Sequence, residues 1–376
     1  MESPKVFIVV LNWNGWQDTL QCLESIYRVS YPNYQVVVLD NASRNDSVGK
    51  IREWVEKRRA AVVFHDKESA ERSTSCDEEN RLEQAHAEYL VLIQTGANRG
   101  FAGGNNIGIR YALSRKADYI LFLNNDAFFR TPDALSIMVE FMEMTSDAGA
   151  CGGRLFYPDG MPQQSYGHFP SVLRTVAYLF PLYKLLPRGW LTGVKRSNVV
   201  PDGATNIPVR IDWPSGACLM ARRSMIEEIG LLDERYFLYM EETDWCCRMK
   251  ASGWQRYYVP GAEVIHRFGG SPGNSADIML LRHLESRFIY YRRHFSRTAV
   301  AVLSAGYLVR AVWSTSLSTA AQYVLPAHRR ERARENVRYW LLAFRLSRDA
   351  LRQLISERIA FKEPVHVKKT APERHA

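Results

Sequence analysis

The chain has 376 residues, 46% of them hydrophobic and 24% charged, which predicts a folded globule with one large α/β domain and an appendage, or two modest domains. Its formal net charge of +9 favours negatively charged partners, such as nucleic acid, an anionic membrane surface or phosphorylated small molecules. The six cysteines contain no C-x-x-C pair, which argues against a zinc ribbon or a disulfide framework and fits a reducing cytosol.

Four apolar runs bounded by turn residues predict buried strands. They are KVFIVVLN (5–12), YQVVVLDN (34–41), EYLVLIQ (88–94) and DYILFLNND (118–126). Helix-like stretches lie between them, and this alternation predicts a mostly parallel sheet covered on both faces. The first run has no basic segment before it and no small-residue cleavage site, so we expect no signal peptide.

Two segments interrupt this pattern. Residues 66–87 are polar, with few apolar positions, and are predicted to form a surface insertion that the core does not need. Residues 172–194 mix Leu, Tyr, Phe and Trp with Arg and Lys. Such an amphipathic segment can cover a core or lie along a membrane.

The pattern turns helical after Pro272, so we expect a domain at 1–271, a helical, membrane-proximal region at 272–361 and a flexible tail at 362–376. Residues 298–326 approach the length of a bilayer span, but Arg310 near the middle favours a packed or interfacial helix. The basic run HRRERARENVR follows at once, as in segments that rest on anionic head groups.

Polar residues end each predicted strand, where ligands bind in open α/β sheets. They are Asn12, Trp13 and Asn14; Asp40, Asn41 and Ser43; Asn98 and Arg99; and Asn124, Asn125 and Asp126. Their positions predict one shared crevice. Trp13 could stack on a base and Asp40 could accept a hydrogen bond from a base or ribose, although a core tryptophan and an Asp-Asn turn are the plainer alternatives.

The stretch NRGFAGGNNIGI (98–109) packs four glycines and three asparagines between two apolar runs. Glycine lets a backbone approach a ligand closely, and an asparagine side chain offers both a donor and an acceptor. We therefore expect this stretch to wrap around a ligand, with an elaborate turn as the alternative.

Acidic residues supply the candidate chemistry. Asp126 after the run YILFL suits a hard divalent cation, or it caps a helix. Glu241, Glu242 and Asp244 gather after YFLYM, where a carboxylate could act as a general base. The alternative is an acidic first helical turn in which Asp244 pairs with Arg248. His266 could complete a metal site.

Taken in order, the stretches VVLNWNG, VVLDNAS, NRGFAGGNNIGI, LFLNNDA and FLYMEETDWCCRMKASGW, followed by VIHRFGGS, resemble the inverting family 2 glycosyltransferases, close to the bacterial rhamnosyltransferase-like branch. The resemblance covers about Lys5 to Ser271. It implies a GT-A fold of class α/β, a mostly parallel mixed sheet flanked by helices, here with a C-terminal helical extension.

The resemblance also implies roles for individual residues. Glu242 would be the catalytic base, with Glu241 as a competing candidate and Asp244 orienting the acceptor or the base. Asp126 and His266 would hold Mg²⁺ or Mn²⁺, with Asn124 in place of the first acid of the family's D-x-D motif. Donor-binding residues would be Asn12, Trp13, Asn14, Asp40, Asn98, Arg99, Gly100, Asn105, Asn106, Asn125 and Gly216.

The implied reaction transfers a sugar, with rhamnose suggested by the branch, from a dTDP- or UDP-sugar to a glycan or polyprenyl-diphosphate-linked acceptor in cell-surface polysaccharide synthesis. The expected location is the cytoplasm, at the inner face of the cell membrane, with no nucleic-acid partner. Three alternatives stay open: a non-catalytic nucleotide-sugar or glycan-binding module, a sugar nucleotidyltransferase, and a dinucleotide-dependent oxidoreductase. The last is disfavoured because GFAGGNNIG lacks the G-x-G-x-x-G spacing.

Overall fold

The structure, a computed structural model, describes residues 3–58, 60–71, 79, 81–82, 89–180, 206–267, 276–324 and 326–356. The chain divides into two compact units, one of Met1–Phe169 with Leu186–Ser286 and the other of Pro170–Leu185 with Arg287–Ala376. This division differs from the expected boundary after residue 271, because the first unit continues to Ser286 and the helical unit takes in 170–185.

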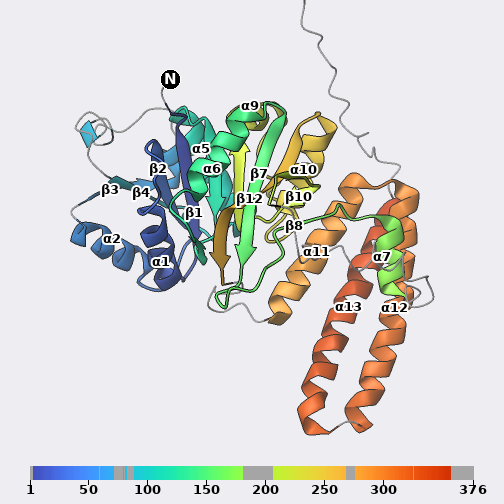
Figure 1. The fold of residues 1–376 in the computed structure, drawn as a ribbon. Helices are drawn as coiled ribbons and strands as arrows, with labels where there is room; N and C mark the ends of the chain where they lie inside the picture. Colours follow the sequence, from blue (N-terminus) through green and yellow to red (C-terminus); the bar gives the residue numbers. More distant parts are fainter. Residues whose placement is uncertain are drawn as a thin grey trace, which may run out of the picture. The chain divides into compact units, whose positions relative to one another are not determined.

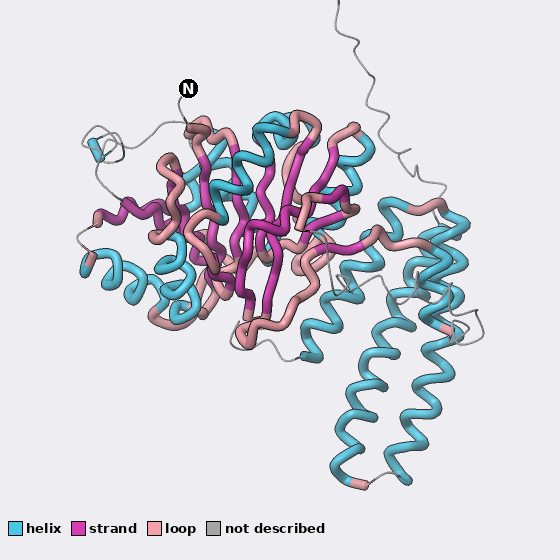
Figure 2. Tube along the Cα trace, viewed as in Figure 1, coloured by secondary structure: helices cyan, strands magenta, loops and turns pink. Residues whose placement is uncertain are grey.

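The first unit is built on a ten-stranded mixed sheet with the order β3-β4-β2-β1-β5-β11-β7-β12-β6, and β9 pairs with β12 (Figures 1 and 2). The strands are β1 Val6–Asn12, β2 Tyr34–Asp40, β3 Ala61–Asp66, β4 Tyr89–Gln94, β5 Tyr119–Leu123, β6 Ala127–Phe129, β7 Ala148–Phe156, β9 Val209–Arg210, β11 Cys218–Arg222 and β12 Gln255–His266. The half from β3 to β5 is parallel, and β11 runs antiparallel to both neighbours. A separate antiparallel pair joins β8 (Tyr166–Gly167) to β10 (Trp213–Pro214).

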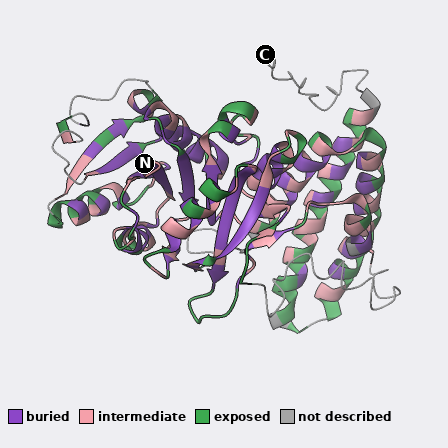
Figure 3. Cartoon of the chain, turned by 45° about the horizontal axis from the view of Figure 1, so that its top comes forward, coloured by how far each residue is buried: buried purple, intermediate pink, exposed green. Residues whose placement is uncertain are grey.

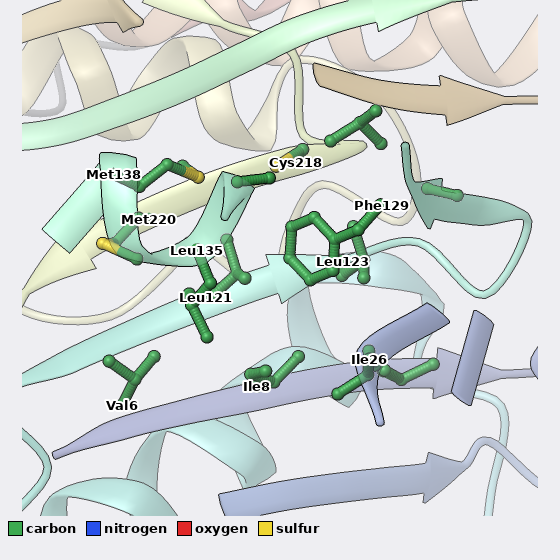
Figure 4. Close-up of a cluster of buried hydrophobic side chains, with 14 of the residues drawn as sticks. Val6, Ile8, Ile26, Leu121, Leu123, Phe129, Leu135, Met138, Cys218 and Met220 are labelled. Atoms are coloured by element: carbon green, nitrogen blue, oxygen red, sulfur yellow. The ribbon is translucent and has the colours of Figure 1, made fainter. Parts of the chain in front are cut away.

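Helices cover both faces of this sheet because successive strand residues point to opposite sides. In β1, Val6 and Ile8 belong to one buried cluster, whereas Phe7 and Val9 belong to the other. The first cluster takes residues from α1 (Trp16–Ile26), α2 (Ser47–Lys57) and α6 (Ala134–Met144), and the second from α3 (Lys67–Glu71), α5 (Gly100–Ser114), α9 (Arg223–Ile229) and α10 (Glu241–Ala251). Figure 4 shows part of the first cluster, and Figure 3 shows the buried strands between helices with exposed outer faces. The predicted α/β sheet flanked by helices is confirmed.

The second unit is helical. It contains α7 (Val172–Leu179), α12 (Arg297–Val324), α13 (Ala327–Ser356) and the end of α11 (Ala276–His294). Asn336 Nδ2 of α13 donates to Ser318 Oγ of α12 at 2.6 Å. By length and composition α12 could cross a membrane, but one of its faces is buried. Of the amphipathic segment 172–194, residues 181–194 lie outside the described residues, as does the tail 362–376.

The segment 66–87 is not wholly at the surface, which corrects the sequence-based expectation. Glu79 is 1% exposed, and its carboxylate accepts hydrogen bonds from Tyr111 Oη at 2.5 Å and Arg115 Nη2 at 2.6 Å, with His65 Nε2 also at 2.6 Å. Burial raises the pKa of Glu79, but the hydrogen bonds from His65, Tyr111 and Arg115 outweigh it and lower the pKa to about 2. A polar segment can thus contribute a core residue when its charge is fully paired.

We expect Glu79→Gln to lower the free energy of unfolding by about 3 kcal/mol, because Arg115 then keeps a buried charge without its partner. The folded pKa of about 2 lies below the ordinary value of 4.5, so this stabilisation is complete above pH 4.5 and is lost as the pH falls towards 2. Thermal unfolding of both proteins between pH 3 and 7 measures it. Equal melting temperatures at pH 7 would contradict the core role of Glu79.

Candidate functional site

Asn12 joins the ends of β1 and β2. Its Nδ2 donates to Asp40 Oδ1 at 2.9 Å and to Ser43 Oγ at 3.1 Å. Its Oδ1 accepts from Thr19 Oγ1 at 3.0 Å and from the Gly15 amide at 3.2 Å. Since Asn12 is fully buried and Asp40 is 2% exposed, this pair acts first as the scaffold of the predicted crevice.

The loop after β1 is fixed by the same kind of contact. Asn14 has a left-handed backbone, with φ of 56°, and its amide donates to Ser43 Oγ at 2.8 Å. The Asn14 side chain accepts from the Arg44 amide at 2.7 Å. Trp13, which lies between Asn12 and Asn14 in the sequence, is half-buried, and its stacking on a base stays a prediction.

Asn41 joins the end of β2 to the start of α5. Its Nδ2 donates to Asn98 Oδ1 and to the Gly100 carbonyl, both at 3.1 Å, and its Oδ1 accepts from the Arg99 amide at 3.1 Å. Asn125, after β5, donates to the Gly15 carbonyl and to Thr19 Oγ1, both at 3.2 Å. The four strand ends therefore meet at one edge of the sheet, as the sequence predicted.

The glycines of 98–109 do not all face a ligand, which corrects that interpretation. A Cβ at Gly104 would lie 2.7 Å from Leu11 Cδ1, and one at Gly108 would lie 2.7 Å from Val9 Cγ1. These glycines let α5 pack closely on β1. Gly100 has φ of 68°, and its missing Cβ makes room for the carbonyl of Phe237.

Asn105 and Asn106 are also directed into the protein, contrary to the expected donor-binding role. Each is 1% exposed. Asn105 Nδ2 donates to the Phe101 carbonyl at 2.9 Å, whereas Asn106 exchanges two hydrogen bonds with the backbone of Leu232. The physical reason is the helical period, which turns both positions towards buried surroundings.

Two other predicted donor residues have distinct surroundings. Arg99 is exposed and lines a cavity of about 340 Å³ together with Lys67 and Arg110, and that cavity includes none of the residues around Asp126. A Cβ at Gly216 would lie 3.6 Å from the Phe101 ring, an ordinary contact. The donor-binding roles of Arg99 and Gly216 stay predictions.

Asp126 and His266 meet as predicted. Pairing of β12 with β6 places His266 opposite Ala127, and His266 Nε2 lies 3.3 Å from Asp126 Oδ1. Gln163 Nε2 donates to the His266 carbonyl, so its Oε1, 2.7 Å from His266 Nδ1, is the acceptor for an Nδ1 proton. The Nε2 lone pair then faces Asp126 and Asn124, whose Nδ2 is 3.4 Å away.

This donor set fits a hard or borderline divalent cation, with an oxygen ligand, an imidazole nitrogen and a second residue that fixes the histidine tautomer. No group of three or more His, Cys, Asp or Glu suited to a metal occurs within the residues that the structure describes. A cation here would need further ligands from a substrate. Gln163, which orients His266, was missed by the sequence analysis because its segment, 157–165, carries no recognisable motif.

The acid pair follows a strained turn. Tyr239 and Met240 have φ of 69° and 70°, each costing about 1–2 kcal/mol for a residue with a side chain. Glu241, directly after them, is 4% exposed, and its Oε2 has no hydrogen-bond partner among the residues that the structure describes. Burial, and then the charge of Glu242, raise the pKa of Glu241 well above its ordinary value.

Glu242 is half-buried and accepts a hydrogen bond from Thr243 Oγ1 at 3.1 Å. Burial raises the pKa of Glu242 as well, while hydrogen bonds from the backbone and from Thr243 oppose the shift. Of the two acids, Glu241 retains its proton more strongly, because it is the more deeply buried and no described residue donates a hydrogen bond to its Oε2. Glu242 is therefore the acid that ionises first and can accept a proton.

Asp244 is too deeply buried to contact an acceptor directly, whereas its expected role in orienting the base stays a prediction. It is fully buried, and its Oδ2 accepts from Arg248 Nε at 2.9 Å. Arg248 donates in turn to the carbonyls of Ile229 and Leu231. The i, i+4 ion pair that the sequence offered as the alternative is the one observed.

Tyr239 is influenced by the charges of acids from two parts of the chain. Burial raises the pKa of its phenol, and the charges of Glu241, Asp126 and Glu242 raise it further. The electrostatic interaction of two charges weakens with distance, so charges that act on one phenol lie in the same region of the molecule. Asp126, in the loop after β5, and the acids at the start of α10 are far apart in sequence but act on the same side chain.

The sequence profile described as "Glycosyl transferase family 2" matches residues 7–74 and 77–230. The chain is 31% identical over 210 residues to an N-acetylglucosaminyl-diphospho-decaprenol L-rhamnosyltransferase of Mycobacterium tuberculosis, a match that covers 53% of this chain and 66%, just under two thirds, of that relative.

Two further proteins match most of the chain. The low-salt glycan biosynthesis hexosyltransferase Agl10 of Haloferax volcanii is 23% identical over 333 residues, covering 85% of this chain and 87% of its own. The mannosyltransferase PcManGT from Pyrobaculum calidifontis, solved in complex with GDP-Man and Mn²⁺, superimposes with a TM-score of 0.49 at 16% identity, covering 96% of this chain and 89% of its own.

Proposed function

The chain belongs to glycosyltransferase family 2, and from that premise we propose that it transfers a sugar, with rhamnose as the first candidate, from a nucleoside diphosphate sugar to a glycan hydroxyl in the assembly of a cell-surface polysaccharide. The observation that carries the proposal is that Asp126, which lies 3.3 Å from His266 Nε2, acts electrostatically on the same phenol, Tyr239, as Glu241 and Glu242 do. Similarity to the mycobacterial L-rhamnosyltransferase supports the choice of sugar.

In the proposed reaction Glu242 takes the proton of the acceptor hydroxyl as its oxygen attacks the anomeric carbon. The bond to the nucleoside diphosphate breaks on the opposite face, so one displacement inverts the configuration. Glu241 stays protonated beside it and adds no charge to the site. A bound Mg²⁺ or Mn²⁺ would offset the negative charge that develops on the leaving diphosphate. Asp126 and His266 would hold that ion, with Gln163 fixing the imidazole.

The two glutamates give a matched test of the base. Glu242→Gln should lower kcat by about 10²–10⁴-fold, because the acceptor hydroxyl loses its proton acceptor, whereas donor binding persists. Glu241→Gln, which mimics a protonated acid, should keep kcat within about threefold of the wild type. Transfer from dTDP- and UDP-sugars to a glycan acceptor measures both, with donor binding checked by thermal shift. The reverse ranking of the two variants would assign the base to Glu241.

The pH dependence of the wild-type activity tests the direction in which the pKa of Glu242 is shifted. Since burial raises the pKa of Glu242, kcat should fall on acidification, with a midpoint at a pH above the ordinary pKa of a glutamate side chain.

Asn124 and Asp126 test the cation. Asp126→Asn should abolish the stabilisation that Mn²⁺ gives in the presence of a nucleoside diphosphate, because it removes the carboxylate ligand. Asn124→Asp should strengthen Mn²⁺ binding by on the order of tenfold, because it adds an anionic oxygen close to His266 Nε2. Thermal melts across a Mn²⁺ titration separate the variants. If both behave as the wild type does, the cation is held elsewhere.

We propose an acceptor carried at an anionic membrane surface, on the inner face of the cell membrane, because the helical unit exposes apolar and basic residues together. Trp313, Tyr323 and Val324 of α12 are 63%, 83% and 85% exposed. Exposed arginines follow at the start of α13: Arg329, Arg330, Arg332 and Arg334. Aromatic and aliphatic side chains beside arginines are typical of helices that lie in a lipid interface. The name of the mycobacterial relative, which includes a diphospho-decaprenol, makes a polyprenyl-diphosphate-linked acceptor the natural candidate.

Vesicle binding tests this surface. The protein should cosediment with phosphatidylglycerol vesicles and much less with phosphatidylcholine vesicles, and salt should weaken the binding. Trp313→Ser should reduce it at every salt concentration, and Arg329→Gln with Arg330→Gln should reduce only the anionic preference. Met144→Ser, which removes an 86% exposed side chain from α6, is the control. No binding to either vesicle would exclude a membrane-bound acceptor surface.

A further inference from the structure

The turn before the acid pair is held from two sides by other parts of the first unit. On one side, the Phe101 amide at the start of α5 donates to the Phe237 carbonyl at 2.7 Å, and Gly100 lets this carbonyl approach. On the other side lie residues of α11, within the part that ends at Ser286. The hydrogen bonds of Asn12, Asn41 and Asn125 at the ends of the strands form what we call the strand-end network, and Asn41 bonds the start of α5. The turn 237–240 thus lies between the strand-end network and α11.

Each residue of the turn from Phe237 to Tyr239 has a partner on α11. The Arg282 guanidinium lies 4.6 Å from the centre of the Phe237 ring. Ser286, 2% exposed, donates from its Oγ to the Leu238 carbonyl at 2.8 Å.

Tyr239 makes the third contact. Its Oη donates to Met279 Sδ at 3.3 Å, and its ring lies 5.4 Å from that of His283. Partners at 279, 282–283 and 286 recur every three to four residues, so one face of α11 contacts three consecutive residues of the turn.

A left-handed conformation at two consecutive residues with side chains does not persist unless the surroundings enforce it. The contacts from α11 end at Tyr239, and Glu241 begins α10 two residues later. Any relaxation of Tyr239 or Met240 would rotate the first turn of α10 and move the carboxylates of Glu241 and Glu242.

We propose that α11 is a positioning clamp, and that Ser286, through its hydrogen bond to Leu238, holds the strained turn so that Glu242 faces the acceptor hydroxyl. This inference rests on the proposed function of Glu242 as the base. Ser286 is a positioning residue, because it bonds to the backbone of the turn and acts on substrate only through Glu242. Loss of the hydrogen bond from Ser286 to Leu238 should therefore misplace Glu242 and leave the strand-end network intact.

Ser286 allows a matched test, because valine and threonine have the same shape and differ in the hydroxyl. Ser286→Val should lower kcat by about 10- to 100-fold, with the donor KM unchanged, because the base loses its alignment. Ser286→Thr, which keeps the donor, should retain most of kcat. Ser347→Ala serves as the control, since it removes another buried serine hydroxyl, one that donates to the Ala343 carbonyl at 2.6 Å within α13.

Hydrogen exchange of the amides from Leu238 to Thr243 gives a readout that does not depend on turnover. It should be faster in Ser286→Val than in Ser286→Thr, and unchanged in Ser347→Ala. Equal kcat and equal exchange in the valine and threonine variants would overturn the clamp. If the wild type transfers no sugar from any donor, the proposed function fails, and the exchange comparison alone decides whether α11 holds the turn.

Discussion

The polar edge of the sheet depends on one constraint: every amide and carboxylate buried at the strand ends must find a partner there. Asn12 meets this requirement for β1 and β2, and Asn41 meets it for β2 and α5. Because one side chain bonds two strand ends at once, the spacing of the strand ends and of the loops after them is fixed before any ligand arrives. Buried residues can then hold the geometry of a site that is made from distant parts of the chain, and few of the residues that touch substrate are needed for that task.

Close backbone packing extends this constraint to the acid pair. Gly100 admits the Phe237 carbonyl, which ties the turn 237–240 to the same helix start that Asn41 holds. The side of the site that ends β2 and the side that carries Glu242 therefore share one structural element, α5. Gly104 and Gly108 perform the complementary task, since they bring α5 against β1.

The sequence predicted four of the strands, β1, β2, β4 and β5, and their parallel arrangement, because buried strands have a clear apolar pattern. The meeting of Asp126 with His266 was expected from the family resemblance. The sequence could not tell which face of α5 points at the sheet, so the asparagines at 105 and 106 were assigned to a ligand when they bind the protein. Glu79 was hidden because composition describes a segment's average, whereas one paired charge can be buried within it. The left-handed turn at Tyr239 and Met240 was invisible, since neither residue type signals a positive φ.

The charge of the site argues for the proposed cation. The charges of Glu241, Asp126 and Glu242 all act on Tyr239, and a nucleoside diphosphate bound as proposed would bring further negative charge to the same region. Two devices reduce the repulsion. Burial raises the pKa of Glu241 well above its ordinary value, which favours its neutral form, and the proposed cation would bind between Asp126 and His266. If the centre binds a diphosphate as proposed, a divalent cation would offset the added negative charge, and its own charge would favour the ionised form of Glu242, which burial disfavours.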